Sequence, residues 1–420
     1  MKHGYHGDDG TKGRTACGVK LLAGLGLVLS GQPTQAGEDL GAALNQGRPI
    51  ADIRLRYERV DQSGLARKAE ALTLRTRLGF ETGAFYDLTA LIEAEITAGL
   101  GPENYNDTIN GRTAFPVVAD PESTELNRAQ LTYSGITDTK ITAGRQRIIL
   151  DNARFVGNVG WRQNEQTFDA VLGSTEWIPD IALTYAYVGQ VHRIFGSDSP
   201  VGEFDSDSHL LNAAFTGLPP VDITGYGYWL DLDEAPAAST TTYGLRAAAS
   251  LPSVSGVAFH LTGDYAHQSD YATNPRSVSL DYYLAEASAT YTGVTGLAGY
   301  EVLEGDGAVG FSTPLATLHA FQGWADVFLA TPASGIEDFY LKAAYVTSEV
   351  PLVTKLTAAV IHHDFSAEQT SASLGSEWDA VITASVDEHV ALTAKYASYD
   401  GPLGGPASRD RLWLEVNFKL

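Results

Sequence analysis

The chain has 420 residues, of which 44% are apolar and 19% are charged, and its formal net charge at pH 7 is −23. These proportions exclude a disordered chain. Because a strongly acidic protein is repelled by the phosphate backbone of nucleic acid, no nucleic-acid partner is expected. Twenty Tyr, fifteen Phe and six Trp beside a single Met are typical of a β-rich protein with aromatic rings at membrane interfaces.

The N-terminal segment has the features of a secretory signal peptide. Lys20 precedes an apolar run over residues 21–29, and Thr-Gln-Ala at 34–36 forms a small-residue cleavage site. The sequence therefore predicts a signal peptide over residues 1–36 and a single outer-membrane barrel domain over 37–420. Acidic residues before the apolar run do not fit a basic leader, which leads to the hypothesis that translation begins at Val19.

No later apolar run approaches the roughly 18 residues that cross a bilayer as a helix. If the protein spans a membrane, it must do so as a closed β-barrel, because unpaired strand edges cannot be satisfied in lipid.

The first predicted strands alternate apolar and polar residues with a period of two. Near residues 50–60, Ile53, Leu55 and Tyr57 alternate with charged residues, and the segments 71–80 and 88–96 repeat the pattern. We expect the polar face of these strands and of the next to line a lumen, through Arg54, Arg56, Glu58, Arg75, Arg77, Glu93, Glu95 and Arg128.

The same alternation continues along the chain and predicts about 18 strands. An even number of strands places both chain termini on the periplasmic side. Short turns near 81–83, 134–137, 217–220, 293–296 and 387–389 alternate with longer segments near 98–124, 147–164, 191–206, 268–277, 304–336 and 400–410. This alternation is typical of periplasmic turns and extracellular loops. A soluble sandwich or propeller is the alternative, but it would not require such an alternation.

The last ten residues form an amphipathic strand, with Leu412, Leu414, Val416, Phe418 and Leu420 on one face. We interpret this strand as the closing strand and as the assembly signal read by the barrel assembly machinery. By parity it should pair with the first strand, which removes both sheet edges.

Two long segments differ from ordinary surface loops. Residues 144–169 are rich in charged and amide side chains, and residues 305–332 are rich in aromatic and aliphatic ones, so we expect both to pack inside the barrel. The guanidinium group is always charged and binds carboxylates bidentately, which suits a passage for anions. In the other interpretation, these groups only pair across the lumen and fix the loop. The predicted constriction residues are Arg145, Arg147, Asp151, Arg154, Arg162, Glu165 and Asp169.

Both segments resemble the alginate export family of outer-membrane porins, and the resemblance extends over essentially the whole mature chain. It implies a monomeric porin of eighteen strands, whose arginine-rich constriction passes an anionic polyuronate or smaller solutes. The alginate exporter itself has a long periplasmic gating loop near its C-terminal end, where this chain has the short turn 387–389. We therefore expect a porin of this kind, without assigning alginate as its solute.

The sequence predicts a porin of the bacterial outer membrane that gives passive, constricted passage to hydrophilic anionic solutes, such as polyuronates, oligosaccharides or small organic acids. The alternatives are a non-selective diffusion porin, a barrel-borne hydrolase, and a structural or adhesive barrel with a blocked lumen. No catalytic motif, cofactor or metal site is predicted, since the adjacent His362 and His363 would point to opposite faces of a strand. The expected partners are outer-membrane lipid and lipopolysaccharide.

Overall fold

The computed structural model describes residues 39–420; the predicted signal peptide and the proposed start at Val19 lie outside this range. A short helix, α1 (Leu40–Asn45), begins after Asp39, whose side chain accepts a hydrogen bond from the backbone of Gly41. The strands that follow are β1 (Arg48–Gln62), β2 (Ala69–Glu81), β3 (Leu88–Gly99), β4 (Ser123–Ile136), β5 (Thr139–Gln146), β6 (Thr167–Ile178), β7 (Ile181–His192), β8 (Glu203–Leu218), β9 (Val221–Trp229), β10 (Thr240–Val254), β11 (Val257–Asp270), β12 (Ser279–Tyr291), β13 (Val294–Leu303), β14 (Ile336–Thr347), β15 (Lys355–Ser366), β16 (Ser373–Ser385), β17 (Val390–Asp400) and β18 (Arg409–Lys419).

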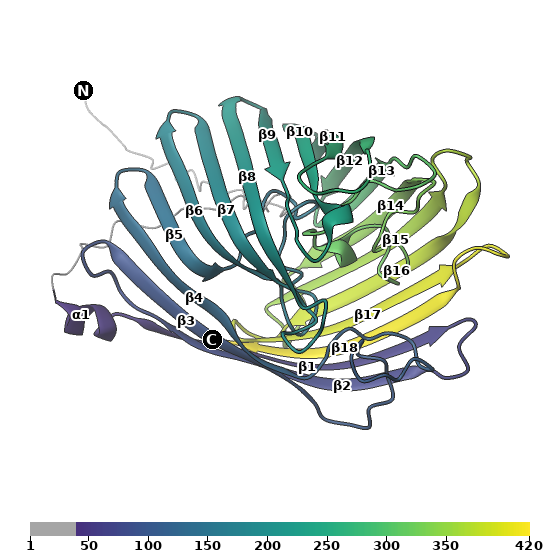
Figure 1. The fold of residues 1–420 in the computed structure, drawn as a ribbon, viewed down its shortest axis with the longest axis horizontal. Coiled ribbons are helices and arrows are strands. Elements are labelled where there is room, and N and C mark those ends of the chain that lie inside the picture. Colours follow the sequence, from purple (N-terminus) through teal and green to yellow (C-terminus); the bar gives the residue numbers. More distant parts are fainter. Residues whose placement is uncertain (1–38) are drawn as a thin grey trace, which may run out of the picture.

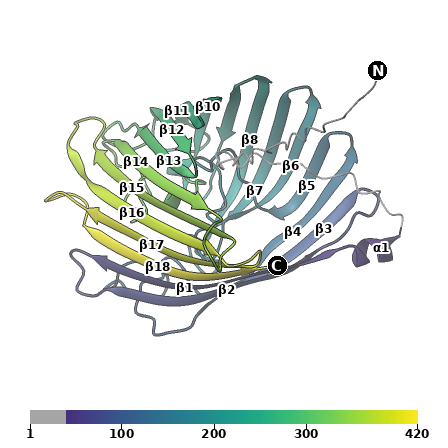
Figure 2. The same ribbon diagram turned by 180° about the vertical axis from the view of Figure 1, so that it is seen from behind.

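The strands form one antiparallel sheet that closes on itself. Each strand pairs with the next along the chain, and β1 pairs with β18, so that the sheet curves into a barrel (Figures 1 and 2). In the closing pair, Leu55 lies opposite Val416 and Tyr57 lies opposite Leu414. Both the predicted count of eighteen strands and the predicted closure are confirmed.

The outer face of the barrel is apolar. Ile92 on β3, Leu245 on β10 and Leu341 on β14 are each about half exposed, and tyrosines such as Tyr243 and Tyr396 share this face. Exposed apolar side chains on every side of a closed barrel require lipid around it, because in water they would form a very large hydrophobic patch. The protein is therefore a transmembrane β-barrel of the bacterial outer membrane, as predicted.

The connections alternate in length as expected. The turns at 137–138, 179–180, 219–220, 255–256 and 292–293 have two residues each, whereas the loops 100–122, 147–166 and 304–335 are long. β1 begins and β18 ends at the edge that carries the short turns, which marks that edge as periplasmic. Within residues 39–420, no helix has the length and apolar character needed to cross a membrane.

Two long connections fold into the lumen, and we call residues 147–166 the first lumen loop and residues 304–335 the second. Both run inside the curve of the sheet (Figure 1). They join each other through a parallel bridge between Val156 and Leu315, and the backbone N–H of Thr317 donates to the carbonyl of Ala153 at 3.0 Å. Because the two loops share backbone hydrogen bonds, they form one plug.

The plug occupies the extracellular half of the barrel. Phe311 and Leu315 of the second lumen loop are fully buried against the inner wall. Nearer the periplasmic edge, the inward-facing Thr290, Thr383 and Thr393 remain partly exposed. The barrel therefore has a polar vestibule on the periplasmic side and a constriction where the loops meet the wall.

Candidate functional site: the charged constriction

The inner wall of β1 and β2 contributes a row of arginines, as the alternation predicts. Arg56 and Arg75 are fully buried, and Arg77 is nearly so. Arg54 and Arg56 both donate hydrogen bonds to the backbone carbonyl of Trp161, at 2.9 Å from the Nη1 of Arg54. These arginines therefore hold the first lumen loop against the wall through its backbone.

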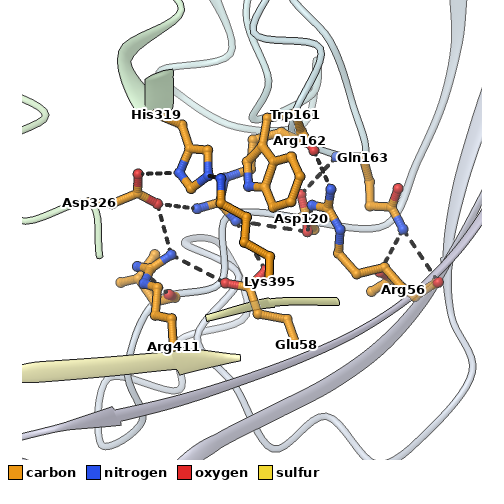
Figure 3. A network of polar contacts seen from close by, with 12 residues as sticks. Arg56, Glu58, Asp120, Trp161, Arg162, Gln163, His319, Asp326, Lys395 and Arg411 are labelled. Atoms are coloured by element: carbon orange, nitrogen blue, oxygen red, sulfur yellow. Dashed lines mark hydrogen bonds and ion pairs between the residues drawn. The ribbon is translucent and has the colours of Figure 1, made fainter. Parts of the chain in front are cut away.

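One ion network joins both lumen loops to the closing seam of the barrel (Figure 3). Arg162 of the first loop donates to Asp326 of the second at 2.7 Å and lies 3.3 Å from Glu58 on β1. Arg411 on β18 reaches the same two carboxylates, at 2.8 Å from Asp326 and 3.2 Å from Glu58. All four side chains are buried, so each charge depends on the others for its stability.

The surroundings shift the pKa of both loop residues in this network. Burial disfavours the charge on Asp326, but His319, Arg411 and Arg162 outweigh burial and hold the pKa of Asp326 well below its usual range. Burial likewise disfavours the charge on Arg162, but Glu58 and Asp326 raise its pKa above the ordinary value. Both groups are therefore charged at neutral pH.

A second network surrounds Glu93 and Glu165. The guanidinium of Arg128 binds Glu93 bidentately at 2.9 and 2.8 Å, and Arg147 donates to Glu165 at 2.6 Å. The amide of Asn127 bridges the two carboxylates at 2.7 Å each. Arg77 and Glu95 pair next to this group on β2 and β3, and Arg77 also lies 3.6 Å from Glu165.

A third group fixes the plug on the opposite wall. Arg154 of the first lumen loop donates to Glu301 on β13 at 2.7 Å, and the hydroxyl of Tyr282 donates to the same oxygen at 2.8 Å. Asp151 accepts from the amide of Asn212 on β8 at 2.7 Å. The predicted residues Asp151 and Arg154 are thus inside the barrel, but they contact the β8–β13 wall and not the arginine row.

Arg145 and Asp169 do not lie in the constriction, which corrects the sequence interpretation. They pair bidentately at 2.8 and 3.0 Å, but their register puts them on the outward face with Ala143 and Val171. The segment 144–169 that the sequence assigns to the constriction includes strand residues at both ends, because β5 continues to Gln146 and β6 begins at Thr167. His192 and Glu203 extend the outward cluster.

Arg54 on β1 and Arg75 on β2 form a pair of neighbouring arginines on the inner wall. They lie directly opposite each other on β1 and β2. Arg75 pairs with Asp52, whereas Arg54 binds only backbone carbonyls. Within residues 39–420, the Nε of Arg54 and the Nε and Nη1 of Arg75 are buried without a hydrogen-bond partner. These nitrogen atoms could donate hydrogen bonds to an anion without displacing a carboxylate that they already bind.

The sequence interpretation missed Lys395 on β17. Its ammonium group lies 3.6 Å from the ring centre of Trp324 and 4.1 Å from that of Trp161, and it contacts His319 at 2.7 Å (Figure 3). Lys395 alternates with the outward-facing Tyr396, so the period of two could have identified it as inward-facing. Arg411, Glu377 and Asp379 could have been found in the same way, whereas Asp120 becomes recognisable only when the loops are in place.

A cavity of about 140 Å³ remains between the second lumen loop and the wall formed by β12 to β15. Phe321 and Trp324 line it on the loop side, and Tyr340 and Lys342 line it on the wall side. Its volume corresponds to a small solute or a few water molecules, which fits a narrow passage. Among residues 39–420, no group of three or more His, Cys, Asp or Glu side chains is arranged to hold a metal ion.

Comparison with solved structures supports the fold. Pseudomonas aeruginosa OpdK with vanillate matches with a TM-score of 0.69 at 13% identity, over 90% of this chain and 99% of that chain. Pseudomonas aeruginosa OccK9 (OpdG) and Acinetobacter baumannii OccAB2 each match with a TM-score of 0.69, at 16% and 15% identity, over 90% of this chain and all of theirs.

No protein-family model matches the chain, and no curated protein matches it. At these identities, the similarity to solved structures concerns the fold of the barrel. The resemblance to alginate export porins therefore remains a prediction from the sequence.

Proposed function

We propose that this protein is an outer-membrane porin that gives constricted, passive passage to hydrophilic anionic solutes, such as small organic acids or oligouronates. The polar vestibule and the charged constriction are the features that a diffusion channel needs. One similar structure, OpdK, was determined with vanillate, which is a carboxylate. The resemblance of the lumen loops to alginate export porins favours acidic saccharides in the same class.

The observation that carries the anion preference is the pair Arg54 and Arg75. Their side chains face the same part of the lumen, and three of their nitrogen atoms have no hydrogen-bond partner in the described part of the chain. Arg54 is also only partly buried, at the boundary of the periplasmic vestibule. A carboxylate arriving from the vestibule would meet two guanidinium groups, of which Arg75 is paired with Asp52, and Glu415 also lies near Arg54.

The other arginines have a different role in this proposal. Arg147, Arg154 and Arg162 each have a buried carboxylate within 3.5 Å, so they fix the plug and contribute a neutralised lining. A passage in which only a short segment attracts the solute binds weakly enough to release it, which conduction requires.

Two charge-matched variants test this assignment. We expect Arg54→Gln to reduce the anion preference and the block of current by oligouronates added to a planar bilayer. Arg48→Gln, on the same strand, removes the same charge from an exposed arginine that is paired with Glu81 at the periplasmic edge. It should leave both quantities close to those of the unmodified protein. Equal effects of the two variants, or none for Arg54→Gln, would contradict the assignment.

We further propose that the chain acts as a monomer, in contact with lipid and lipopolysaccharide, and that β18 is the segment read by the barrel assembly machinery. The closed β1–β18 pair supports a lumen contained in one chain. A single-copy mass in native mass spectrometry from detergent is the expected result, and a stable trimer would contradict it.

A further inference from the structure

The constriction contains one contact that does not fit a purely structural ion network, between His319 and Lys395. His319 belongs to the second lumen loop and Lys395 to β17. The Nε2 of His319 lies 2.7 Å from the ammonium nitrogen, while its Nδ1 lies 2.7 Å from the carboxylate of Asp326 (Figure 3). Two basic groups are therefore in direct contact inside the barrel.

This arrangement requires a neutral imidazole. A lysine ammonium group can only donate, so the Nε2 of His319 must accept, and the Nδ1–H then donates to Asp326. The ring of His319 also stacks on Trp161 of the first lumen loop, with ring centres 4.7 Å apart and planes 5° apart. Neutral His319 thus connects both lumen loops to Lys395 on the wall.

Adding a proton to His319 breaks this connection. The imidazolium would present an N–H to the ammonium group of Lys395, and both cations would lie over the face of Trp161. Burial, together with Lys395 and Arg162, outweighs the attraction of Asp326 and lowers the pKa of His319 to about 3. The ordinary value near 6.5 is recovered only if the residue reaches water.

Other charged groups face this contact from each neighbouring element. Asp326 lies in the same loop and Arg162 in the first lumen loop, and Arg411 approaches Asp326 from β18. On β16, Glu377 and Asp379 accept hydrogen bonds from the backbone of Ala325 and Trp324, at 2.6 and 3.2 Å. These two carboxylates and Lys395 itself are the competing candidates for any response to acid.

We propose that His319 and Lys395 form an acid-sensitive latch, in which neutral His319 holds residues 317–326 against β17 and protonation of His319 releases this segment and widens the constriction. Because the released histidine binds protons more readily than the docked one, acid favours the released state. Between pH 7.5 and pH 4.5, the ratio of released to docked protein should rise on the order of 100-fold.

Two readouts test the latch. The first is hydrogen exchange of residues 317–326 in the full chain in detergent, corrected for the intrinsic exchange rate, and the second is single-channel open probability in a planar bilayer. Both should increase as the pH falls to 4.5. Only the second readout depends on the proposed passage of solutes. If residues 317–326 exchange faster in acid but no current is observed, the proposed function is refuted and the latch is supported.

Three variants identify the group that titrates. His319→Gln should abolish the acid response, whereas His363→Gln, which changes a buried histidine on β15, should retain it. Lys395→Met removes the cation and should speed the exchange of residues 317–326 already at pH 7.5. If the response persists in His319→Gln, it belongs to Lys395, Glu377 or Asp379, and the proposal is wrong. An unmodified protein with no acid response would also overturn it.

Discussion

Buried charged residues in the lumen are stabilised by neighbouring residues of opposite charge. Arg162 and Arg411 share the carboxylates of Glu58 and Asp326, so that two positive and two negative charges neutralise each other. Removing one of these four side chains leaves a buried charge without its partner. This lowers the free energy of unfolding far more than removing one partner of a solvent-exposed ion pair.

Glu58 therefore provides a clear stability test. We expect Glu58→Leu to lower the free energy of unfolding by about 3–5 kcal/mol, because Arg162 and Arg411 lose a shared partner. Urea unfolding in detergent measures this change. The control is Glu103→Gln, which removes the partner of Arg112 in an exposed pair and should cost less than about 1 kcal/mol. A similar small cost for both would show that the network does not stabilise the fold.

At the residue scale, the period of two was enough to identify the inward-facing arginines. It correctly gave Arg54, Arg56, Arg75 and Arg77 to the inner face of β1 and β2. It failed for Arg145, because the end of β5 could not be located where charged residues continue beyond the strand. The ion partners of the arginines could not be predicted, since they come from loops distant in the sequence.

At the scale of elements, the second lumen loop lies very close to the barrel wall at β16. Gly323 in the second lumen loop has a φ of +80°, and a Cβ there would overlap the carboxylate of Glu377 on β16. The positive φ favours glycine at this position, and the Glu377 side chain would have to move to make room for a Cβ.

This close approach predicts the effect of Gly323→Ala. The added methyl group should displace the second lumen loop from Glu377 and raise the single-channel conductance measured in planar bilayers. Gly64→Ala is the matched control, because Gly64 also has a positive φ, of +85°, but has no atom near the added Cβ. Both variants carry the same kind of backbone strain, so only the overlap differs. Equal conductance in the two variants would refute the role of the contact.

The inward folding of both long loops was predicted from their composition, whereas their mutual contacts were not. The aromatic and aliphatic content of residues 305–332 indicated packing inside the barrel, and Phe311 and Leu315 are indeed buried there. The bridge between Val156 and Leu315 joins segments about 160 positions apart, and no local pattern specifies such a pairing. The contribution of loop 100–122, through Asp120, was likewise not foreseen.

At the scale of the whole molecule, the barrel is defined by its two faces. The sequence predicted the closed barrel, its strand count and its location, because the alternation of side chains is a local property repeated eighteen times. The bilayer determines how much a substitution on the outer face destabilises the barrel, whereas the inner face carries the charged side chains.

A charge on the outer face should be costly only where lipid surrounds it. Leu414→Arg, in the middle of β18 on the outward face, should lower the free energy of unfolding by about 2–4 kcal/mol in lipid vesicles. Thr393→Arg faces the periplasmic vestibule from β17 and should carry no such penalty. If the two substitutions had equal effects, the assignment of the two faces would be wrong.

We propose that the constriction passes solutes and favours anions, because Arg54 and Arg75 have donors on the inner wall without hydrogen-bond partners among residues 39–420. The most direct measurement is the reversal potential of the unmodified protein in a planar bilayer under a gradient of potassium chloride. We expect open channels whose reversal potential has the sign set by chloride. A potential with the sign set by potassium would contradict the anion preference, and the absence of any conductance would contradict passage through the barrel.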